Sequence, residues 1–182
     1  AIGSFNAFLK DKQKKHPSSQ MSIVLFDDQY LIRENATPIQ QVDVLTNDTF
    51  VPRGSTALLD AVGKTIQIIE DRKHVDDEVL IAVLTDGQEN SSQEYTLKQI
   101  QRMIKQKEER GWDFVYLSAD PSAFTDAQNM GFDRLKIAHY NKNHIQDAYC
   151  EMDSMMSVKL SKMKAMRRMK EDGQENADKM YQ

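Results

Sequence analysis

The sequence predicts an α/β fold, in which helices flank both faces of a mostly parallel, doubly wound sheet. Residues 79–85 form an uncharged run of aliphatic and β-branched side chains, which is typical of a strand buried on both faces. Similar runs alternate with amphipathic segments along most of the chain, a pattern that favours parallel strands joined by helices. At 182 residues and 40% hydrophobic content, the chain can bury the core of one such domain.

The amino-terminal elements follow from apolar spacing. A first helix is predicted by an apolar stripe at helical spacing, made of Ile2, Phe5, Phe8 and Leu9. It is expected to end near His16 and Pro17, because proline interrupts helices. Residues 21–26 predict a strand, and residues 30–33 predict its hairpin partner at a sheet edge. Residues 38–48 are irregular, with one short apolar alternation at Ile39, Val42 and Val44.

The later elements alternate regularly. They are a helix at 56–71, a strand at 79–85, a helix at 96–110, a strand at 113–118, a short helix around 124–130 and an edge strand at 134–138. Glycine commonly ends a helix, since it adopts the left-handed conformation without strain. Gly111 and Gly131 are therefore predicted to end the second and third of these helices.

Three parts are expected along the chain: an α/β domain over residues 1–142, one or two helices over 143–170, and a flexible tail over 171–182. Seven of the ten methionines lie from Met152 onward, among many charged residues. Two interpretations of this methionine-rich helix stay open. In the first, the helix packs on its own domain and its long basic side chains cover apolar surface. In the second, the helix docks onto a partner protein or a second copy of the chain.

Composition narrows the classes of partner. A formal net charge of −4 gives no electrostatic case for nucleic acid binding. The single cysteine, Cys150, excludes an intrachain disulfide and a cysteine-rich zinc site. No apolar run reaches the length of a membrane-spanning helix, so no membrane partner is expected and a cytoplasmic location is the default. Glycine-rich phosphate loops and nucleophile elbows are absent from the sequence, which favours a protein that is not an enzyme.

Two polar loops are expected at one edge of the sheet. Asp86 and Gly87 follow the strand at 79–85, and the carboxyl ends of parallel strands are where such sheets hold ligands. Thr56 precedes a helix in a second loop about thirty residues earlier. A hydroxyl and a carboxylate side by side offer the oxygen ligands that Mg²⁺ prefers. Each residue also has a simpler explanation than metal binding. Asp86 could serve only as a turn or helix-capping residue, and Ser55 or Thr56 could serve only to cap the helix that follows.

These loops resemble those of the von Willebrand factor A family. The resemblance extends over residues 1–138 in the order of strands and helices, and it is closest to the small stand-alone bacterial or phage-encoded members of the family. Residues 54–61 match the threonine loop of the family's metal-ion-dependent adhesion site, and residues 84–87 match its aspartate loop. The resemblance implies a Rossmann-like fold, with Thr56 binding Mg²⁺ or Mn²⁺ directly and Asp86 binding it directly or through water. It also implies a protein partner that offers an acidic residue to the cation, and a location in the cytoplasm, a virion or a host cytoplasm. The residues expected around the partner are Arg53, Gly54, Ser55, Gly87, Gln88, Glu89 and Asn90.

The sequence departs from the family at one point, because it contains no Asp-x-Ser-x-Ser turn. The predicted helix at 2–15 resembles the family's first helix, which follows that turn. Either residues upstream of Ala1 supply the first strand and its loop, or the protein has lost that half of the site. Loss of a central strand would expose the apolar faces of its neighbours, so we expect an upstream segment.

The function expected from these observations is a non-enzymatic, metal-dependent protein-binding module. The alternative is a metal-independent structural or assembly component that binds partners through the methionine-rich helix, and a phage-encoded protein is one version of this alternative. Asp27 and Asp28 form a pair at the predicted hairpin turn, away from the Asp86 loop in chain order, and we expect them to be solvated turn residues.

Overall fold

The computed structural model describes residues 2–49, 54–72, 77–85, 87–118, 123–133 and 137–139, together with positions 150, 154 and 158. The chain divides into two compact units, residues 1–149 and 150–182. The expected boundaries after residues 142 and 170 stay predictions, as does the methionine-rich helix, most of which lies outside the described residues. Within the described part of the chain, no helix combines the length and apolar character needed to cross a membrane.

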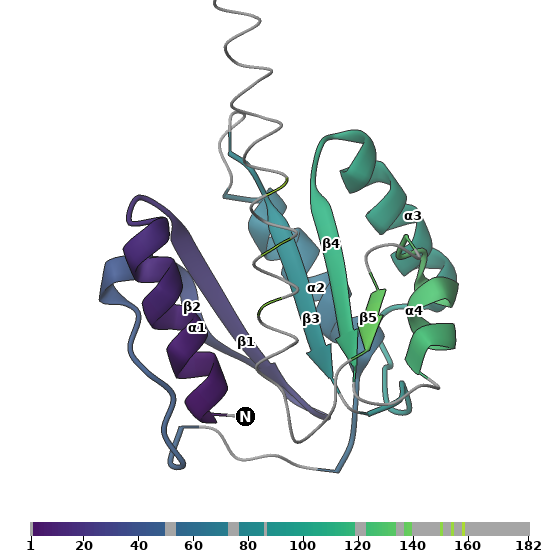
Figure 1. Cartoon of the computed structure of the whole chain (residues 1–182). Coiled ribbons are helices and arrows are strands. Elements are labelled where there is room, and N and C mark those ends of the chain that lie inside the picture. The colour runs from purple at the N-terminus through teal and green to yellow at the C-terminus, as the bar shows by residue number, and fades with distance from the viewer. Residues whose placement is uncertain are drawn as a thin grey trace, which may run out of the picture. The chain divides into compact units, whose positions relative to one another are not determined.

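In the first unit, a helix and a β-hairpin come first, and helices and strands alternate from α2 (Leu58–Glu70) onward (Figure 1). In chain order the elements are α1 (Ile2–Lys15), β1 (Gln20–Phe26), β2 (Tyr30–Pro38), the short 3₁₀ helix η1 (Ile39–Gln41), α2 (Leu58–Glu70), β3 (Leu80–Thr85), α3 (Leu97–Glu109), β4 (Asp113–Ser118), α4 (Ala123–Met130) and β5 (Ile137–His139). Their types agree with the sequence prediction throughout. The main difference is the hairpin partner, since β2 continues five residues beyond Arg33 to Pro38.

The described strands form two sheets. β1 and β2 pair as an antiparallel hairpin, and β3, β4 and β5 form a parallel sheet in that order. The fold is therefore mixed α/β, as predicted. β5 lies at the edge of the parallel sheet, which also agrees with the prediction. Thr85, Ser118 and His139 align in register where the three parallel strands end, and their row marks the carboxyl edge of the sheet.

The prediction that residues 79–85 are buried on both faces is wrong for part of this strand. In β3, Ile81 and Val83 are buried, but Ala82 between them is exposed. The strand with two buried faces is β4, where every residue from Phe114 to Ser118 is buried. The reason is position, because β4 has a hydrogen-bonded neighbour on each side whereas β3 pairs with β4 alone among the described residues.

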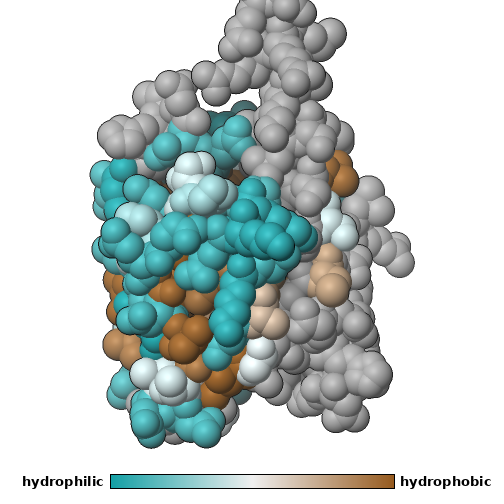
Figure 2. All heavy atoms as spheres, turned by 60° about the vertical axis from the view of Figure 1, so that its left-hand side comes forward, coloured by the Kyte–Doolittle hydropathy of each residue, from teal (hydrophilic) through white to brown (hydrophobic). Residues whose placement is uncertain are grey.

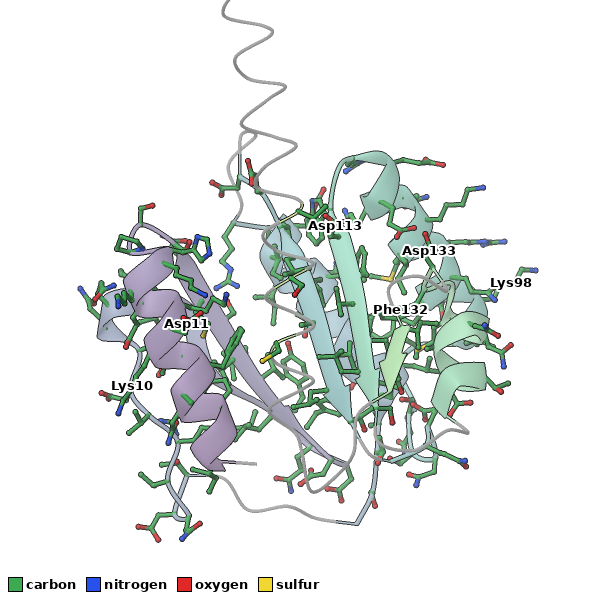
Figure 3. All side chains as sticks on the ribbon, viewed as in Figure 1. Lys10, Asp11, Lys98, Asp113, Phe132 and Asp133 are labelled. Carbon is green, nitrogen blue, oxygen red and sulfur yellow. The ribbon has the colours of Figure 1, made fainter. Side chains whose placement is uncertain are left out.

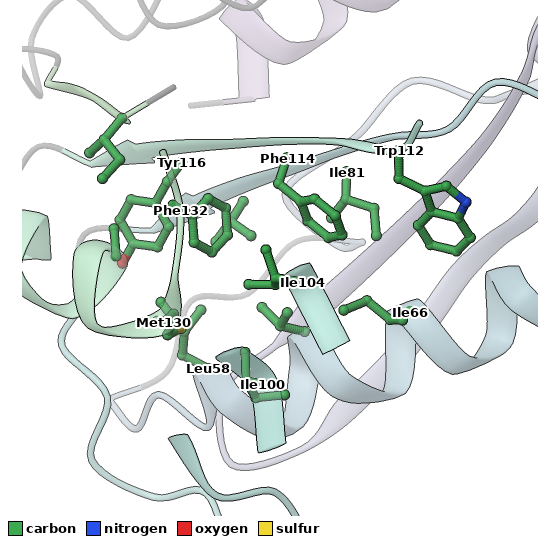
Figure 4. Packing of buried hydrophobic residues seen from close by; sticks show 14 of the residues in the cluster. Leu58, Ile66, Ile81, Ile100, Ile104, Trp112, Phe114, Tyr116, Met130 and Phe132 are labelled. Carbon is green, nitrogen blue, oxygen red and sulfur yellow. The ribbon is translucent and has the colours of Figure 1, made fainter. Parts of the chain in front are cut away.

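The main core lies between the parallel sheet and the helices α2, α3 and α4 (Figure 4). An aromatic cluster runs along β4, with Trp112 stacked on Phe114 and the ring of Phe132 packed edge-on against Phe114 and Tyr116. Burial of such large side chains dominates the stability of a domain of this size. The helices contribute the buried residues Leu58, Val62, Ile66, Ile100, Ile104, Ala127 and Met130.

A second cluster holds α1 against the hairpin. Its buried members are Leu9, Ile23, Ile39 and Val42. The side-chain amide of Asn6 also donates to the carbonyl of Leu45 and accepts from its N–H, at 2.9 and 2.8 Å. Figure 2 turns the side of α1 and β2 toward the viewer and shows apolar side chains gathered low on a largely hydrophilic face. The exposed large apolar residues of this part of the chain are Leu31, Ile32 and Val44.

Helix ends follow the sequence signals. Thr96 caps α3 through a reciprocal capping box with Gln99. Gly111 and Gly131 have φ values of +84° and +94°, so both predicted glycine caps are confirmed. Figure 3 shows Lys98 projecting from the first turn of α3 away from the sheet, and Asp113 at the start of β4. The carboxyl edge lies at the other end of that strand.

Candidate functional site

Three loops meet beside the carboxyl edge of the parallel sheet. The first leads into α2 and contains Thr56, the second follows β3, and the third is the hairpin turn after β1. The N–H of Ala57 donates to the carbonyl of Asp27 over 2.7 Å. The hairpin turn therefore lies beside the threonine loop, although Asp27 and Ala57 are distant in the sequence. The turn is remote from the Asp86 loop in chain order, yet this hydrogen bond places it next to the threonine loop in space.

Thr56 is joined to the loop after β3 at two points. Its N–H donates to the side-chain Oδ1 of Asn90 over 3.0 Å, and its carbonyl accepts the N–H of Asn90 over 3.1 Å. Gly87 of the same loop approaches Thr56 so closely that a Cβ at position 87 would collide with the Thr56 hydroxyl oxygen. The absence of a side chain at Gly87 therefore permits this close approach of the two loops.

The threonine hydroxyl does not cap α2. The N-cap residue is Ala57, which has no capping side chain, and neither Ser55 nor Thr56 takes that role. The capping alternative for these two residues is therefore wrong. Among the described residues, the Thr56 hydroxyl has no hydrogen-bond partner.

Glu89 and Ser92 cap α2 from the other loop. The Oε2 atom of Glu89 accepts the N–H of Leu59 over 2.9 Å, and the Oγ of Ser92 accepts the N–H of Asp60 over 3.1 Å. Glu89 also accepts the N–H groups of Ser91 and Ser92 through Oε1. Unpaired N–H groups in the first turn of a helix need such acceptors, and a carboxylate there also interacts favourably with the helix dipole.

Asp60 fixes the next part of the same loop. Its buried carboxylate accepts the backbone N–H groups of Gln93, Glu94 and Tyr95 at 2.8, 2.9 and 2.8 Å. Burial by itself raises the pKa of the Asp60 carboxyl, but these three donors outweigh burial and hold the pKa below the ordinary aspartate value. Asp60 is therefore ionised at neutral pH and serves the structure of the loop.

The turn after β3 is held by Thr85. Its hydroxyl accepts the N–H of Gly87 over 3.2 Å and contacts the Gly87 carbonyl at 3.3 Å. Gly87 thus lies between two threonine hydroxyls, those of Thr85 and Thr56.

The structure brings some of the predicted site residues together and leaves others undescribed. Asp86 and Arg53 lie outside the described residues. Thr56 is hydrogen-bonded to Asn90, and Gly87 lies close to the Thr56 hydroxyl. The remaining predicted residues differ in exposure: Gly54 and Gln88 are exposed, whereas Ser55 and Glu89 are partly buried.

The described residues contain no cluster of three or more His, Cys, Asp or Glu side chains able to hold a metal ion. The oxygen donors that the sequence predicts for a hard cation are the hydroxyl of Thr56 and the carboxylate of Asp86, and the second lies outside the described residues. Metal binding by these residues stays a prediction.

Sequence reasoning missed Asp60, Ser92 and the turn at Asp27. Asp60 and Ser92 each bond a residue more than thirty positions away, and such pairs carry no periodic signal. The only local hint was an acidic residue in the first turn of a helix, which ordinarily indicates no more than a favourable helix-dipole interaction.

Comparison of the chain with models of known protein families gives no match, and comparison with curated proteins gives none either.

Proposed function

We propose that this protein is a non-enzymatic protein-binding module whose site is the carboxyl edge around Thr56 and Asp86. A divalent cation, Mg²⁺ or Mn²⁺, would be held by the Thr56 hydroxyl and the Asp86 carboxylate, the latter directly or through water. The cation supplies a positive charge that can take a carboxylate from the partner protein. Arg53, Gly54, Ser55, Gly87 and Gln88 would surround that contact.

The observation that carries the proposal is the contact between Thr56 and Gly87. Two loops that the sequence singles out separately, about thirty residues apart, approach so closely that a Cβ at position 87 would meet the Thr56 hydroxyl oxygen. The Thr56 hydroxyl in that contact is neither a helix cap nor a partner in any hydrogen bond among the described residues. A polar group held in a fixed place without a structural partner is what a ligand site requires.

The proposal treats Glu89 and Asn90 differently from the sequence prediction, which placed both beside the partner. Both carboxylate oxygens of Glu89 accept hydrogen bonds within the protein. The side chain of Asn90 accepts the Thr56 N–H. We therefore assign these two residues to the support of the site, because their side chains bond other residues of these loops, and leave the partner contact to the other predicted residues.

We extend the proposal to the fold, as one doubly wound sheet that resembles the von Willebrand factor A domain. The hairpin is tied to the same helix as the parallel sheet, which supports it. The hydroxyls of Tyr30 on β2 and Thr65 on α2 are 2.9 Å apart, and Phe26 of β1 packs against the main core. A strand joining β1 to β3 would complete such a sheet.

Cation binding is expected to be weak for the isolated chain. Mg²⁺ requires near-octahedral oxygen coordination and keeps its waters tightly, so two protein ligands give little affinity. Mn²⁺ has the same preference for carboxylate and hydroxyl oxygens and offers a spectroscopic signal. Millimolar concentrations are therefore the sensible range for a first titration.

The test is the thermal midpoint of the chain in Mn²⁺ or Mg²⁺ against EDTA, for the wild type and for Asp86→Ala. A ligand that binds only the folded state raises the midpoint in proportion to its occupancy. We expect a rise in the wild type that Asp86→Ala abolishes. Asp43→Ala is the matched control, because Asp43 is an exposed aspartate in the segment packed beside α1 and should keep the rise. Equal midpoints with and without metal in the wild type would refute the proposal.

A further inference from the structure

We infer that Asn90 is a positioning residue that fixes Thr56 for the cation, and this inference rests on the proposed function. Sequence reasoning placed Asn90 beside the partner protein. Its hydrogen bonds point to a role inside the site, as the residue that holds the threonine loop against the loop after β3.

The two bonds between Thr56 and Asn90 act on the backbone on both sides of the Thr56 Cα. One uses the Thr56 N–H and the other its carbonyl, at 3.0 and 3.1 Å. Rotation of the peptide units at Thr56 would break one or both bonds. The direction in which the Thr56 side chain leaves the backbone is thereby restricted, and its hydroxyl is held against Gly87.

Asn90 can act as a fixed reference because its own loop is braced on α2. Glu89, the preceding residue, accepts the N–H of Leu59. Asp60 accepts three N–H groups a few residues further on. The loop from 89 to 95 is therefore attached to the helix on both sides of Asn90, and Thr56 precedes that same helix by two residues. Outer residues that orient metal ligands typically affect metal affinity by tenfold or more.

The experiment measures Mn²⁺ affinity at 20 °C by the loss of the free Mn²⁺ electron paramagnetic resonance signal, which reports binding separately from thermal stability. Asn90→Ala should weaken Mn²⁺ binding about tenfold, because the bond from Asn90 Oδ1 to the Thr56 N–H is lost. Asn90→Asp keeps an acceptor in the same place and should restore wild-type affinity to within about threefold. Asn90→Glu carries the same charge on a longer side chain and should bind as weakly as Asn90→Ala.

Ser92→Ala is the matched control, because Ser92 braces the same loop on α2 without contacting Thr56. It should lower the thermal midpoint in EDTA yet leave Mn²⁺ affinity within about twofold of the wild type. Wild-type affinity in Asn90→Ala, or restored affinity in Asn90→Glu, overturns the positioning role while leaving the proposed function intact. Absence of Mn²⁺ binding by the wild-type chain overturns both.

Discussion

The backbone N–H of Tyr95 donates to the Asp60 carboxylate over 2.8 Å, although 35 positions separate the two residues in the chain. The N–H groups of Gln93 and Glu94 converge on the same carboxylate. One side chain on α2 therefore organises the segment that leads from the candidate site to α3. The Tyr95 ring also lies over Gly63, where a Cβ would collide with it, so the segment is packed closely on the helix.

Replacement of Asp60 by alanine should destabilise the protein by about 3 kcal/mol, because three N–H groups lose a charged acceptor. The free energy of unfolding in urea measures this loss. Asp126 is the control, since it is the acidic residue in the first turn of α4 and has no such partners among the described residues. Asp126→Ala should cost less than about 1 kcal/mol, the size of a helix-dipole interaction. Equal losses in the two variants would contradict the role given to Asp60.

The stability of the protein should fall in acid, partly because the Asp60 carboxylate becomes protonated. The pKa of Asp60 is lower in the folded state than its ordinary value, so the folded state binds its proton less readily than the unfolded state does. The contribution of ionised Asp60 to stability is complete at pH values above the ordinary aspartate pKa of about 4. It is lost as the pH falls through the lowered pKa of the folded state. The difference in unfolding free energy between wild type and Asp60→Ala should therefore shrink between about pH 5 and pH 2. A difference that stays constant over this range would show that ionisation of Asp60 does not matter.

Replacement of Gly87 by alanine should disturb the candidate site. The added methyl group meets the Thr56 hydroxyl oxygen, so the Thr56 side chain must rotate or the two loops must separate, and we expect a loss of about 1–3 kcal/mol. Gly54→Ala is the matched change in the threonine loop, since a Cβ there has no neighbour within 4 Å, and it should stay within about 0.5 kcal/mol of the wild type. If Gly87→Ala were as stable as Gly54→Ala, the close approach of the two loops would be disproved.

Replacing Ser91 and replacing Ser92 by alanine should change the free energy of unfolding in opposite directions. The Ser91 Oγ is shielded from solvent and has no hydrogen-bond partner among the described residues, so its removal should stabilise the protein by about 1 kcal/mol. The Ser92 hydroxyl accepts the Asp60 N–H and bonds Glu89, so its removal should destabilise by about 1–2 kcal/mol. Thermal and urea unfolding of the two variants side by side checks both signs. Destabilisation by Ser91→Ala would show that its hydroxyl has a partner in solution.

Much of the fold could be predicted from the sequence because local signals determine single elements. The apolar stripe at 2–15, the glycines at 111 and 131 and the alternation of strands with helices all describe near neighbours in the chain. Burial was predicted less well. Ala82 is exposed although β3 has an apolar sequence, because the exposure of a strand residue depends on which strands pair with that strand.

The candidate site divides in the same way. The sequence singles out Thr56 and Asp86 because their residue types and their places next to a helix and a strand suit a hard cation. It also offered a plainer role for Thr56 as a helix cap. Only the tertiary structure decided against that role, by showing Glu89 and Ser92 from another loop at the start of α2.

By itself, then, the sequence determined the order and type of the elements and the residue types available at the carboxyl edge. The tertiary structure decided which of those residues meet: Asp27 beside Ala57, Asn90 on Thr56, Gly87 against the Thr56 hydroxyl, and Asp60 under the segment 93–95. The physical reason is the distance along the chain over which each kind of interaction acts. Helix and strand formation depends on residues within a few positions, whereas each of these contacts joins segments about thirty positions apart and forms only when the whole core has packed.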